Sequence, residues 1–229
     1  MCIRDSIISP SEYTKGVLRE YGVRRDIQVI SNGVDTDAFR HNEKKRREFR
    51  REHNLQGLVV YSVGHVFKRK GVIEFIELAR KFPDNQFMWV GRNYRELGDS
   101  DVKKAVKKKP ENVIFTGYVK DVAAAYSAGD IFLFPSWCEN QGISVLEAAA
   151  SGRPIIIRDL PTYEGWLTHG VNCLKAKDNQ EFEKHIISLI DDEDLRGKLA
   201  ENAYRMSQEH ALKKVGAQMK EAYETLLRK

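Results

Sequence analysis

Two glutamates and a glycine form the stretch of the chain that is best suited to chemistry. Seven residues separate Glu139 from Glu147, and Gly142 lies between them. An ionised carboxylate only accepts hydrogen bonds, and neighbouring sugar hydroxyls donate them in pairs. Gly142 allows close approach to the backbone, and a helix that begins beside it favours an anion such as phosphate. The three residues predict a sugar diphosphate site, although by spacing alone the glutamates could merely cap and decorate a helix start.

A strand, a helix and a second strand must position these residues. The apolar run 130–135 predicts a buried strand, residues 143–150 are good helix formers, and residues 154–157 supply the next strand. Parallel strands joined in this way point their carboxyl ends at one edge of a sheet, and ligands bind in the crevice there. We therefore expect Glu139 in the loop after the first strand and Glu147 little more than one turn into the helix.

A second strand-to-helix junction carries a cluster of basic residues. Residues 58–64 read as an apolar strand, and a helix begins near Gly71. Lys68, Arg69 and Lys70 crowd the loop between them. A lysine at such a junction can reach a phosphate as a compact point charge.

The rest of the chain alternates between helical and strand patterns. Strands separated by helices indicate the α/β class with a doubly wound parallel sheet, here followed by a helical tail. We expect strands at 7–9, 27–30, 86–90, 113–115 and 172–174, and helices at 12–21, 44–54, 72–81, 101–108, 121–127 and within 179–229.

The composition is that of an ordinary globular protein of 229 residues, with 41% hydrophobic and 31% charged residues. No apolar run approaches the roughly 18 residues that span a bilayer, and no signal-peptide pattern is present, so we expect a cytoplasmic protein. Cys2, Cys138 and Cys173 are too few and too scattered for a disulfide framework. The six histidines show no metal-ligand spacing, and no metal is expected.

Two basic segments account for much of the net charge of +5: residues 44–54 and the lysines at 103, 104, 107 and 108. They are compatible with a solvated helix face, an anionic membrane surface or nucleic acid. No recognised nucleic-acid motif or stacking aromatic platform accompanies the lysines, so we expect no nucleic-acid partner.

The stretch ENQGISVLE, residues 139–147, resembles the signature of the retaining glycosyltransferases of family 4, which have the GT-B fold. Five further blocks resemble that family and occur in its order, so the similarity covers nearly the whole chain. They are ISPSEYTKGVL (8–18), SNGVD (31–35), VGHVFKRKG (63–71), FTGYV (115–119) and AGDIFLFPS (128–136).

The resemblance implies a role for each residue of a donor site. Lys70 would hold the donor diphosphate and Glu139 the transferred hexose, which makes these two the catalytic residues. Glu147 would bind the ribose, and the backbone around Tyr118 and Val119 would meet the base. For Tyr118 and Val119, the residues alone indicate only a turn between a strand and a helix.

The resemblance adds Gly64, His65, Arg69, Gly142 and Ile143 to the donor-binding residues. At one of them the chain departs from the family pattern, which usually has arginine directly after the glycine. His65 removes that permanent cation. Either Lys68 or Arg69 compensates, or His65 is a loop residue without a ligand.

The resemblance also divides the chain. Residues 1–35 would close an amino-terminal acceptor domain that is otherwise missing here. Within them, residues 1–6 (MCIRDS) fit nothing that follows, and we interpret them as an artefactual start. Residues 36–210 would form the Rossmann-like nucleotide-sugar domain. Residues 211–229 would hold a helix, centred on 215–227, that crosses back to the first domain.

The segment RDLPTYEGWL, residues 158–167, resembles Gram-positive 1,2-diacylglycerol glucosyltransferases, which make membrane glycolipids. In that interpretation Tyr163 and Trp166 lie near the cleft, and the basic helices hold the enzyme at the inner face of the membrane. The alternative is that both are core aromatics.

Together these resemblances imply hexosyl transfer, with retention of configuration, from UDP-glucose to a hydroxyl acceptor such as diacylglycerol. The nucleotide sugar is a substrate, and no cofactor is expected. Two alternatives stay open: a non-catalytic nucleotide-sugar-binding module, and a sugar-nucleotide epimerase of similar architecture.

Overall fold

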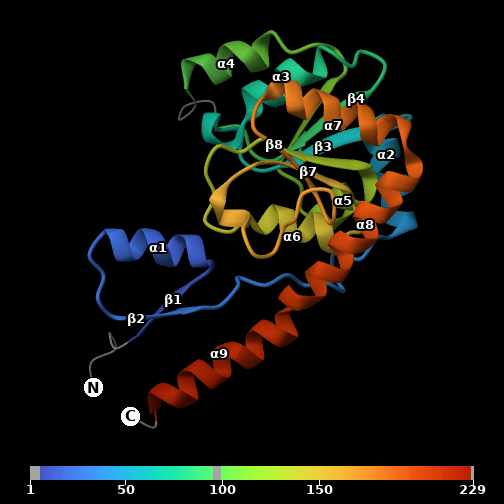
Figure 1. The fold of residues 1–229 in the computed structure, drawn as a ribbon. Helices are drawn as coiled ribbons and strands as arrows, with labels where there is room; N and C mark the ends of the chain where they lie inside the picture. Colours follow the sequence, from blue (N-terminus) through green and yellow to red (C-terminus); the bar gives the residue numbers. More distant parts are fainter. Residues whose placement is uncertain (1–5, 95–98, 228–229) are drawn as a thin grey trace.

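A six-stranded parallel sheet forms the centre of the larger part of the molecule (Figure 1). The computed structural model describes residues 6–94 and 99–227. The strand order is β5-β4-β3-β6-β7-β8, so the chain reverses its direction of growth between β3 and β6, and the expected doubly wound α/β fold is confirmed. The strands are β3 (Val59–Val63), β4 (Gln86–Val90), β5 (Val113–Gly117), β6 (Ile131–Phe134), β7 (Ile155–Arg158) and β8 (Leu174–Ala176).

Helices cover both faces of this sheet. One face packs against α2, α5 and α6, and the other against α3, α4 and α7, while α8 contributes to both layers. Their bounds are α2 (Glu43–Glu52), α3 (Val72–Ala79), α4 (Ser100–Lys107), α5 (Val122–Ala128), α6 (Ile143–Ala150), α7 (Asn179–Asp191) and α8 (Glu193–Ser207), with short 3-10 turns η1 (Lys68–Lys70), η2 (Pro161–Tyr163) and η3 (Gln208–His210).

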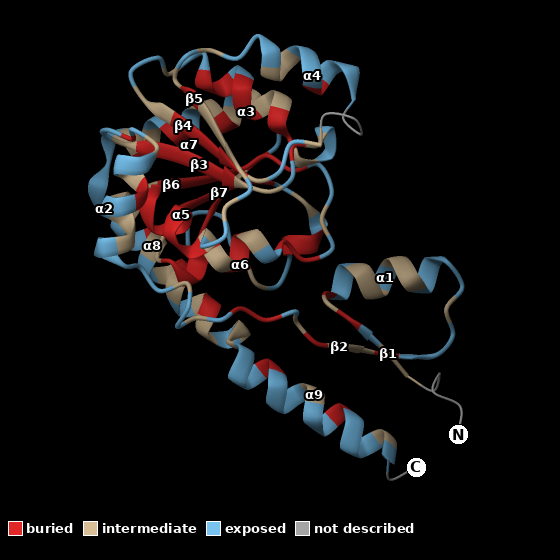
Figure 2. Cartoon of the chain, turned by 180° about the vertical axis from the view of Figure 1, so that it is seen from behind, coloured by how far each residue is buried: buried red, intermediate tan, exposed pale blue. Residues whose placement is uncertain are grey.

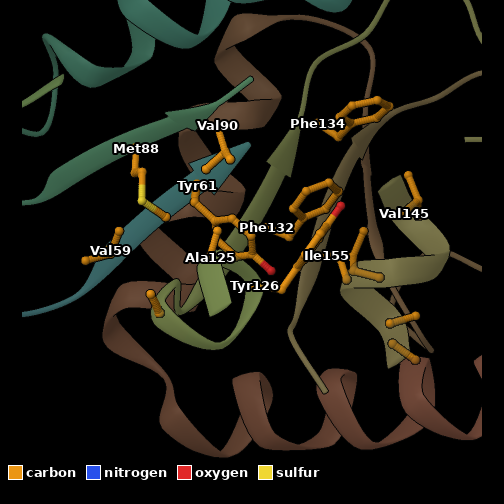
Figure 3. Packing of buried hydrophobic residues seen from close by; sticks show 14 of the residues in the cluster. Val59, Tyr61, Met88, Val90, Ala125, Tyr126, Phe132, Phe134, Val145 and Ile155 are labelled. Carbon is orange, nitrogen blue, oxygen red and sulfur yellow. The ribbon is translucent and has the colours of Figure 1, made fainter. Parts of the chain in front are cut away.

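Alternate residues of each strand enter the two layers of the core. Tyr61, Phe132 and Phe134 pack with α5 and α6, and Figure 3 shows these rings gathered beside Tyr126 and Val145. The alternate residues of β6, Ile131 and Leu133, pack with α3 and α7 on the opposite face. A sheet that is apolar on both faces must be covered on both, which is why continuous apolar runs predicted these strands correctly.

A smaller part lies apart from the sheet (Figure 1). It contains β1 (Ser6–Ser9), α1 (Glu12–Glu20), β2 (Asp26–Val29) and α9 (Leu212–Leu227). β1 and β2 form a separate two-stranded parallel sheet, and α1 has no buried residue. Figure 2 shows that α9 is exposed along most of its length, with buried residues only where Val215 and Ala222 pack near Ile30.

The chain crosses between the two parts twice at one place. Val34 and Ala211 form an isolated parallel bridge. The Val34 amide donates to the His210 carbonyl, and the Leu212 amide donates to the Val34 carbonyl, both at 2.9 to 3.0 Å. The linker after β2 and the connection into α9 therefore run side by side.

Three expectations need correction. Ser6 belongs to β1, where it pairs with Asp26, so this strand begins one residue before the expected 7–9; residues 1–5, including Cys2 and most of the predicted artefactual start, lie outside the described residues. The last strand is Leu174–Ala176, because the side chain of Asn172 bonds to the Thr168 amide and the Trp166 carbonyl and so stabilises a turn. Helix α3 stops at Ala79, before the chain turns at Lys81 and Phe82.

The basic helix α2 is only partly a solvated face. Arg46 and Arg50 turn inward and both pair with Asp130, at 2.8 and 3.2 Å. The same guanidinium groups donate to the carbonyls that end α5, including that of Ala128. Asp130 also accepts the Val59 amide at 2.8 Å, so its carboxylate joins α2 to β3, while the two arginines join α2 to the end of α5.

We predict that Asp130→Asn lowers the free energy of unfolding by about 2 to 3 kcal/mol, because two partly buried guanidinium groups lose their anion. Urea unfolding at pH 7 measures this. The matched control is Glu193→Gln, whose partner Arg196 lies 3.9 Å away and whose own side chain is 91% exposed; the expected change is below about 0.5 kcal/mol. Equal effects of the two variants would contradict the prediction.

Candidate functional site

A cavity of about 480 Å³ lies at the carboxyl edge of the sheet, between η1 and the loop that joins β6 to α6. Five of the predicted donor-site residues line it. They are Arg69, Lys70, Glu139, Gly142 and Ile143, together with Asn32, Cys138, Asn140, Gln141 and Ser144. Segments that are far apart in sequence therefore meet here, as the predicted sheet requires.

Gly71 permits this meeting. It has a left-handed φ of +76°, and a β-carbon at this position would lie 2.3 Å from the Pro135 carbonyl oxygen. No side chain fits at that separation, so only glycine lets the turn before α3 touch the end of β6. The Trp137 amide then donates to the Arg69 carbonyl at 2.8 Å and joins the two loops.

Lys70 and Glu139 form an ion pair at the wall of the cavity. Lys70 Nζ lies 2.5 Å from Glu139 Oε1, and the two side chains are only 13% and 9% exposed. Ser136 Oγ donates to the same carboxylate oxygen at 2.7 Å. The lysine stem crosses Gly64 and its ammonium lies 5.1 Å from the centre of the Phe134 ring. Both predicted catalytic groups thus lie together, each neutralised by the other.

Helix α6 begins beside this pair. Gly142 precedes it with φ of +87°, and no side chain in the described ranges caps its first amides. A β-carbon on Gly142 would lie 3.1 Å from the ring of Tyr163, which packs directly beneath the turn. The uncapped amides and the positive end of the helix dipole are suited to an anion at the cavity.

Glu147 lies on α6 and is not among the residues that line the cavity. Tyr126 Oη donates to its Oε2 at 2.6 Å and is also 3.2 Å from the Ser144 carbonyl oxygen. Burial raises the pKa of Glu147, and the Tyr126 hydrogen bond opposes part of that change. The carboxylate is therefore largely desolvated beside α5.

The remaining predicted donor residues lie around the edge rather than in this cavity. His65 is exposed and packs against the rings of Phe67 and Tyr94. Tyr118 and Val119 line a separate cavity of about 360 Å³ next to α2, and the Arg92 guanidinium lies 4.6 Å from the centre of the Tyr118 ring. The structure therefore gathers the predicted phosphate and hexose groups and places the predicted base contacts apart from them.

The sequence left open whether Tyr163 and Trp166 are core aromatics. Tyr163 is one, and Trp166 is only partly so. Tyr163 is fully buried, whereas Trp166 is half-buried and donates to the Thr162 carbonyl at 3.0 Å. Burial raises the pKa of Tyr163 well above its usual value. The Tyr163 ring supports the site loop, because it packs against Gly142, whereas Trp166 packs against the rings of Tyr163 and His210.

Sequence reasoning missed three residues of this loop. Ser136 bonds Glu139, Gln141 is buried and bonds the linker, and the Asn140 carbonyl accepts several hydroxyl groups. Ser136 lies two residues after the end of β6, which was a usable signal, because side chains there reach the crevice. Nothing in the local pattern marks the other two.

The family is established by comparison with known proteins. Residues 43–206 match the model of the glycosyl transferases group 1, and residues 3–38 match that of glycosyltransferase family 4. The chain therefore belongs to the group 1 glycosyl transferases, and the resemblance noted from the sequence is confirmed.

Relatives of known name include two enzymes that are named for diacylglycerol or its glycosylated forms. The chain is 35% identical, over 99% of its length and 69% of the relative, to the processive diacylglycerol alpha-glucosyltransferase of Acholeplasma laidlawii. It is 31% identical to the alpha-galactosylglucosyldiacylglycerol synthase of Streptococcus pneumoniae, over 67% of this chain and 42% of that protein.

The fold also matches solved structures. Anabaena HepE in complex with UDP and glucose superimposes with a TM-score of 0.88 at 20% identity, over 96% of this chain and 63% of that one. The chain thus spans less than two thirds of that structure, and this likeness supports the fold.

We predict that Glu147→Gln raises the melting temperature in the absence of ligand at pH 7. A folded-state pKa above the unfolded value means that the folded state binds more protons between the two values, so stability falls as pH rises through that window. Above it the carboxylate costs its full desolvation, which the amide avoids. Melting curves from pH 3 to 8 measure this, and the difference should disappear at the acidic end, below the pKa of the unfolded state. A variant that is less stable at pH 7 would contradict it.

Proposed function

We propose that this protein transfers a hexose from UDP-glucose to a hydroxyl acceptor with retention of configuration, and that the described chain supplies the donor-binding half. The observation that carries the proposal is the ion pair of Lys70 and Glu139 beside the uncapped start of α6. A cation and free amides suit a diphosphate, and a carboxylate suits the hydroxyls of the attached sugar.

In this proposal the donor separates the ion pair. The diphosphate takes Lys70 and the first amides of α6, and the released Glu139 carboxylate accepts hydrogen bonds from the hexose. As the bond from the anomeric carbon to the diphosphate breaks, negative charge grows on the leaving oxygen, where Lys70 and the helix terminus stabilise it. Electrostatic stabilisation of this kind needs no metal.

The nucleoside would lie along the edge of the sheet. We propose that Glu147 accepts from the ribose, after exchanging its bond to Tyr126 or sharing it, and that the backbone at Tyr118 and Val119 meets the base. Gly64, His65 and Arg69 border the path of the phosphates. All of these roles come from the family pattern.

The division of the chain is likewise a proposal. Residues 1–35 would end an acceptor domain, 36–210 would form the nucleotide-sugar domain and 211–229 would return to the first domain. The exposed α1 and the separate pair β1 and β2 support this, because a two-stranded sheet is only marginally stable alone.

The acceptor proposed is a membrane lipid, diacylglycerol or a glycosylated form of it. The named relatives act on or produce such lipids, according to their names. None of the helices within the described ranges is long and apolar enough to cross a bilayer. We propose that contact with the inner face of the membrane is peripheral and is made by exposed basic residues.

Titration of three variants with UDP and with UDP-glucose tests the donor site. Lys70→Ala should weaken both ligands by about 1.5 to 3 kcal/mol, one to two decades, because a charged hydrogen bond is lost. Glu147→Ala should weaken the binding of UDP and of UDP-glucose by the same factor. Glu139→Ala should weaken UDP-glucose and leave UDP unchanged or tighter, because Lys70 is then already free for the diphosphate.

Calorimetry on variants that keep the wild-type melting profile measures these constants, with Lys81→Ala as a control lysine at the far side of α3. Weaker UDP binding by Glu139→Ala would contradict the assignment of roles. Release of free UDP without any acceptor would instead favour an epimerase, and binding without transfer by the whole protein would favour a non-catalytic module.

Vesicle sedimentation tests the proposed membrane contact. The protein should adsorb through the exposed lysines of α4 to anionic and not to neutral vesicles. Each lysine should contribute about 1 kcal/mol, and the adsorption should be lost at high salt. Removing Lys103, Lys104 and Lys107 together should abolish much of this adsorption, whereas Arg46→Ala should not, because that side chain faces Asp130. Equal, negligible binding to both vesicles would favour a soluble acceptor.

A further inference from the structure

Three segments of the chain meet at the side chain of Ser31. Gln141, which is only 3% exposed, donates through Nε2 to Ser31 Oγ at 2.7 Å and accepts the Asn32 amide through Oε1 at 2.9 Å. His210 Nδ1 lies 3.0 Å from the same hydroxyl. The loop of Glu139, the linker after β2 and the entry to α9 are therefore joined at one point.

The donors and acceptors at this point are fully matched. Ser31 Oγ receives hydrogen bonds from Gln141 and from the Gly33 amide at 3.1 Å, which occupy its two lone pairs. Its own proton is then left for His210 Nδ1. Burial lowers the pKa of His210, which favours the neutral ring that can accept that proton. Glu209 is the charged neighbour that opposes this shift.

A second connection holds the adjacent residue of the loop. The Asn140 carbonyl accepts from Ser11 Oγ at 2.6 Å and from Thr162 Oγ1 at 2.9 Å. Ser11 is also the N-cap of α1, where its oxygen accepts the Thr14 amide. Asn140 and Gln141, the two residues between Glu139 and Gly142, are therefore both bonded to the amino-terminal part of the chain. Asn140 bonds to the start of α1, and Gln141 bonds to the linker after β2.

We infer that Gln141 is a positioning residue, which couples the placement of the amino-terminal segment to the geometry of the loop that carries Glu139. Any rotation of that segment about the bridge between Val34 and Ala211 moves Ser11 or Ser31 relative to residues 140–141. Glu139 directly precedes those residues, so its carboxylate moves with them, whereas the first amides of α6 belong to a helix whose start packs on the buried ring of Tyr163. That this loop binds a nucleotide sugar rests on the proposed function.

The coupling itself can be tested without any ligand. Gln141→Met keeps the volume of the side chain and removes its hydrogen bonds, and Ser31→Ala removes the hydroxyl. Hydrogen exchange on the purified protein should become faster at residues 138–144 in both variants. Ser31→Ala is the decisive one, because the change lies in a different segment. The control Gln180→Ala, an exposed residue in the first turn of α7, should leave this segment unchanged.

Donor titration then tests positioning. Gln141→Met and Ser31→Ala should each weaken UDP-glucose about tenfold and UDP by less than about twofold, because a displaced Glu139 affects only the hexose. The double variant should be no weaker than either single variant, since both break the same connection.

The outcomes separate the two ideas. Unchanged exchange at 138–144 in Ser31→Ala overturns the coupling, and additive losses of UDP-glucose affinity, or equal losses for UDP, overturn the positioning role. Wild-type protein that binds neither ligand refutes the proposed function, while the exchange result still decides whether the linker and the loop are coupled.

Discussion

The mutual neutralisation of Lys70 and Glu139 is the constraint on which the site depends. Each side chain is nearly removed from water, and a buried charge without a partner is strongly destabilising, so neither group can be held in place alone. The pair adds little to stability, because desolvation offsets most of the attraction. The pair keeps two opposite charges close together, so that the cation and the carboxylate can bind two different groups of one ligand.

The remaining architecture serves to bring these two charges together. The parallel sheet places the ends of β3 and β6 side by side, Gly71 removes the side chain that would keep their loops apart, and the bond from the Trp137 amide to the Arg69 carbonyl fixes the separation. The charges on α2 act at the opposite end of the same strands, where Asp130 fastens the amino-terminal edge. The rigidity of the sheet thus sets the geometry of the site.

Most of the fold could be predicted from the sequence, because fully buried strands leave continuous apolar runs and helices leave a periodic pattern. Errors arose where side chains override local preference, as Asn172 does by stabilising a turn and as Arg46 and Arg50 do by turning inward. The motif also identified Lys70, Glu139 and Gly142. It did not show that Lys70 and Glu139 pair with each other, that Glu147 bonds to Tyr126, or that Gln141 reaches Ser31. Those contacts depend on tertiary distances between segments, and no local periodicity encodes them.

The bridge between Val34 and Ala211 has a consequence for how such proteins diversify. The chain enters and leaves the larger part at adjacent positions, as an inserted domain does. A segment with neighbouring ends can be exchanged as a unit by recombination without stretching either connection. Only the few side chains at the junction, chiefly Ser31, Gln141 and His210, would have to match their new neighbours, so chimeras within the family should be viable when those three positions are transplanted together.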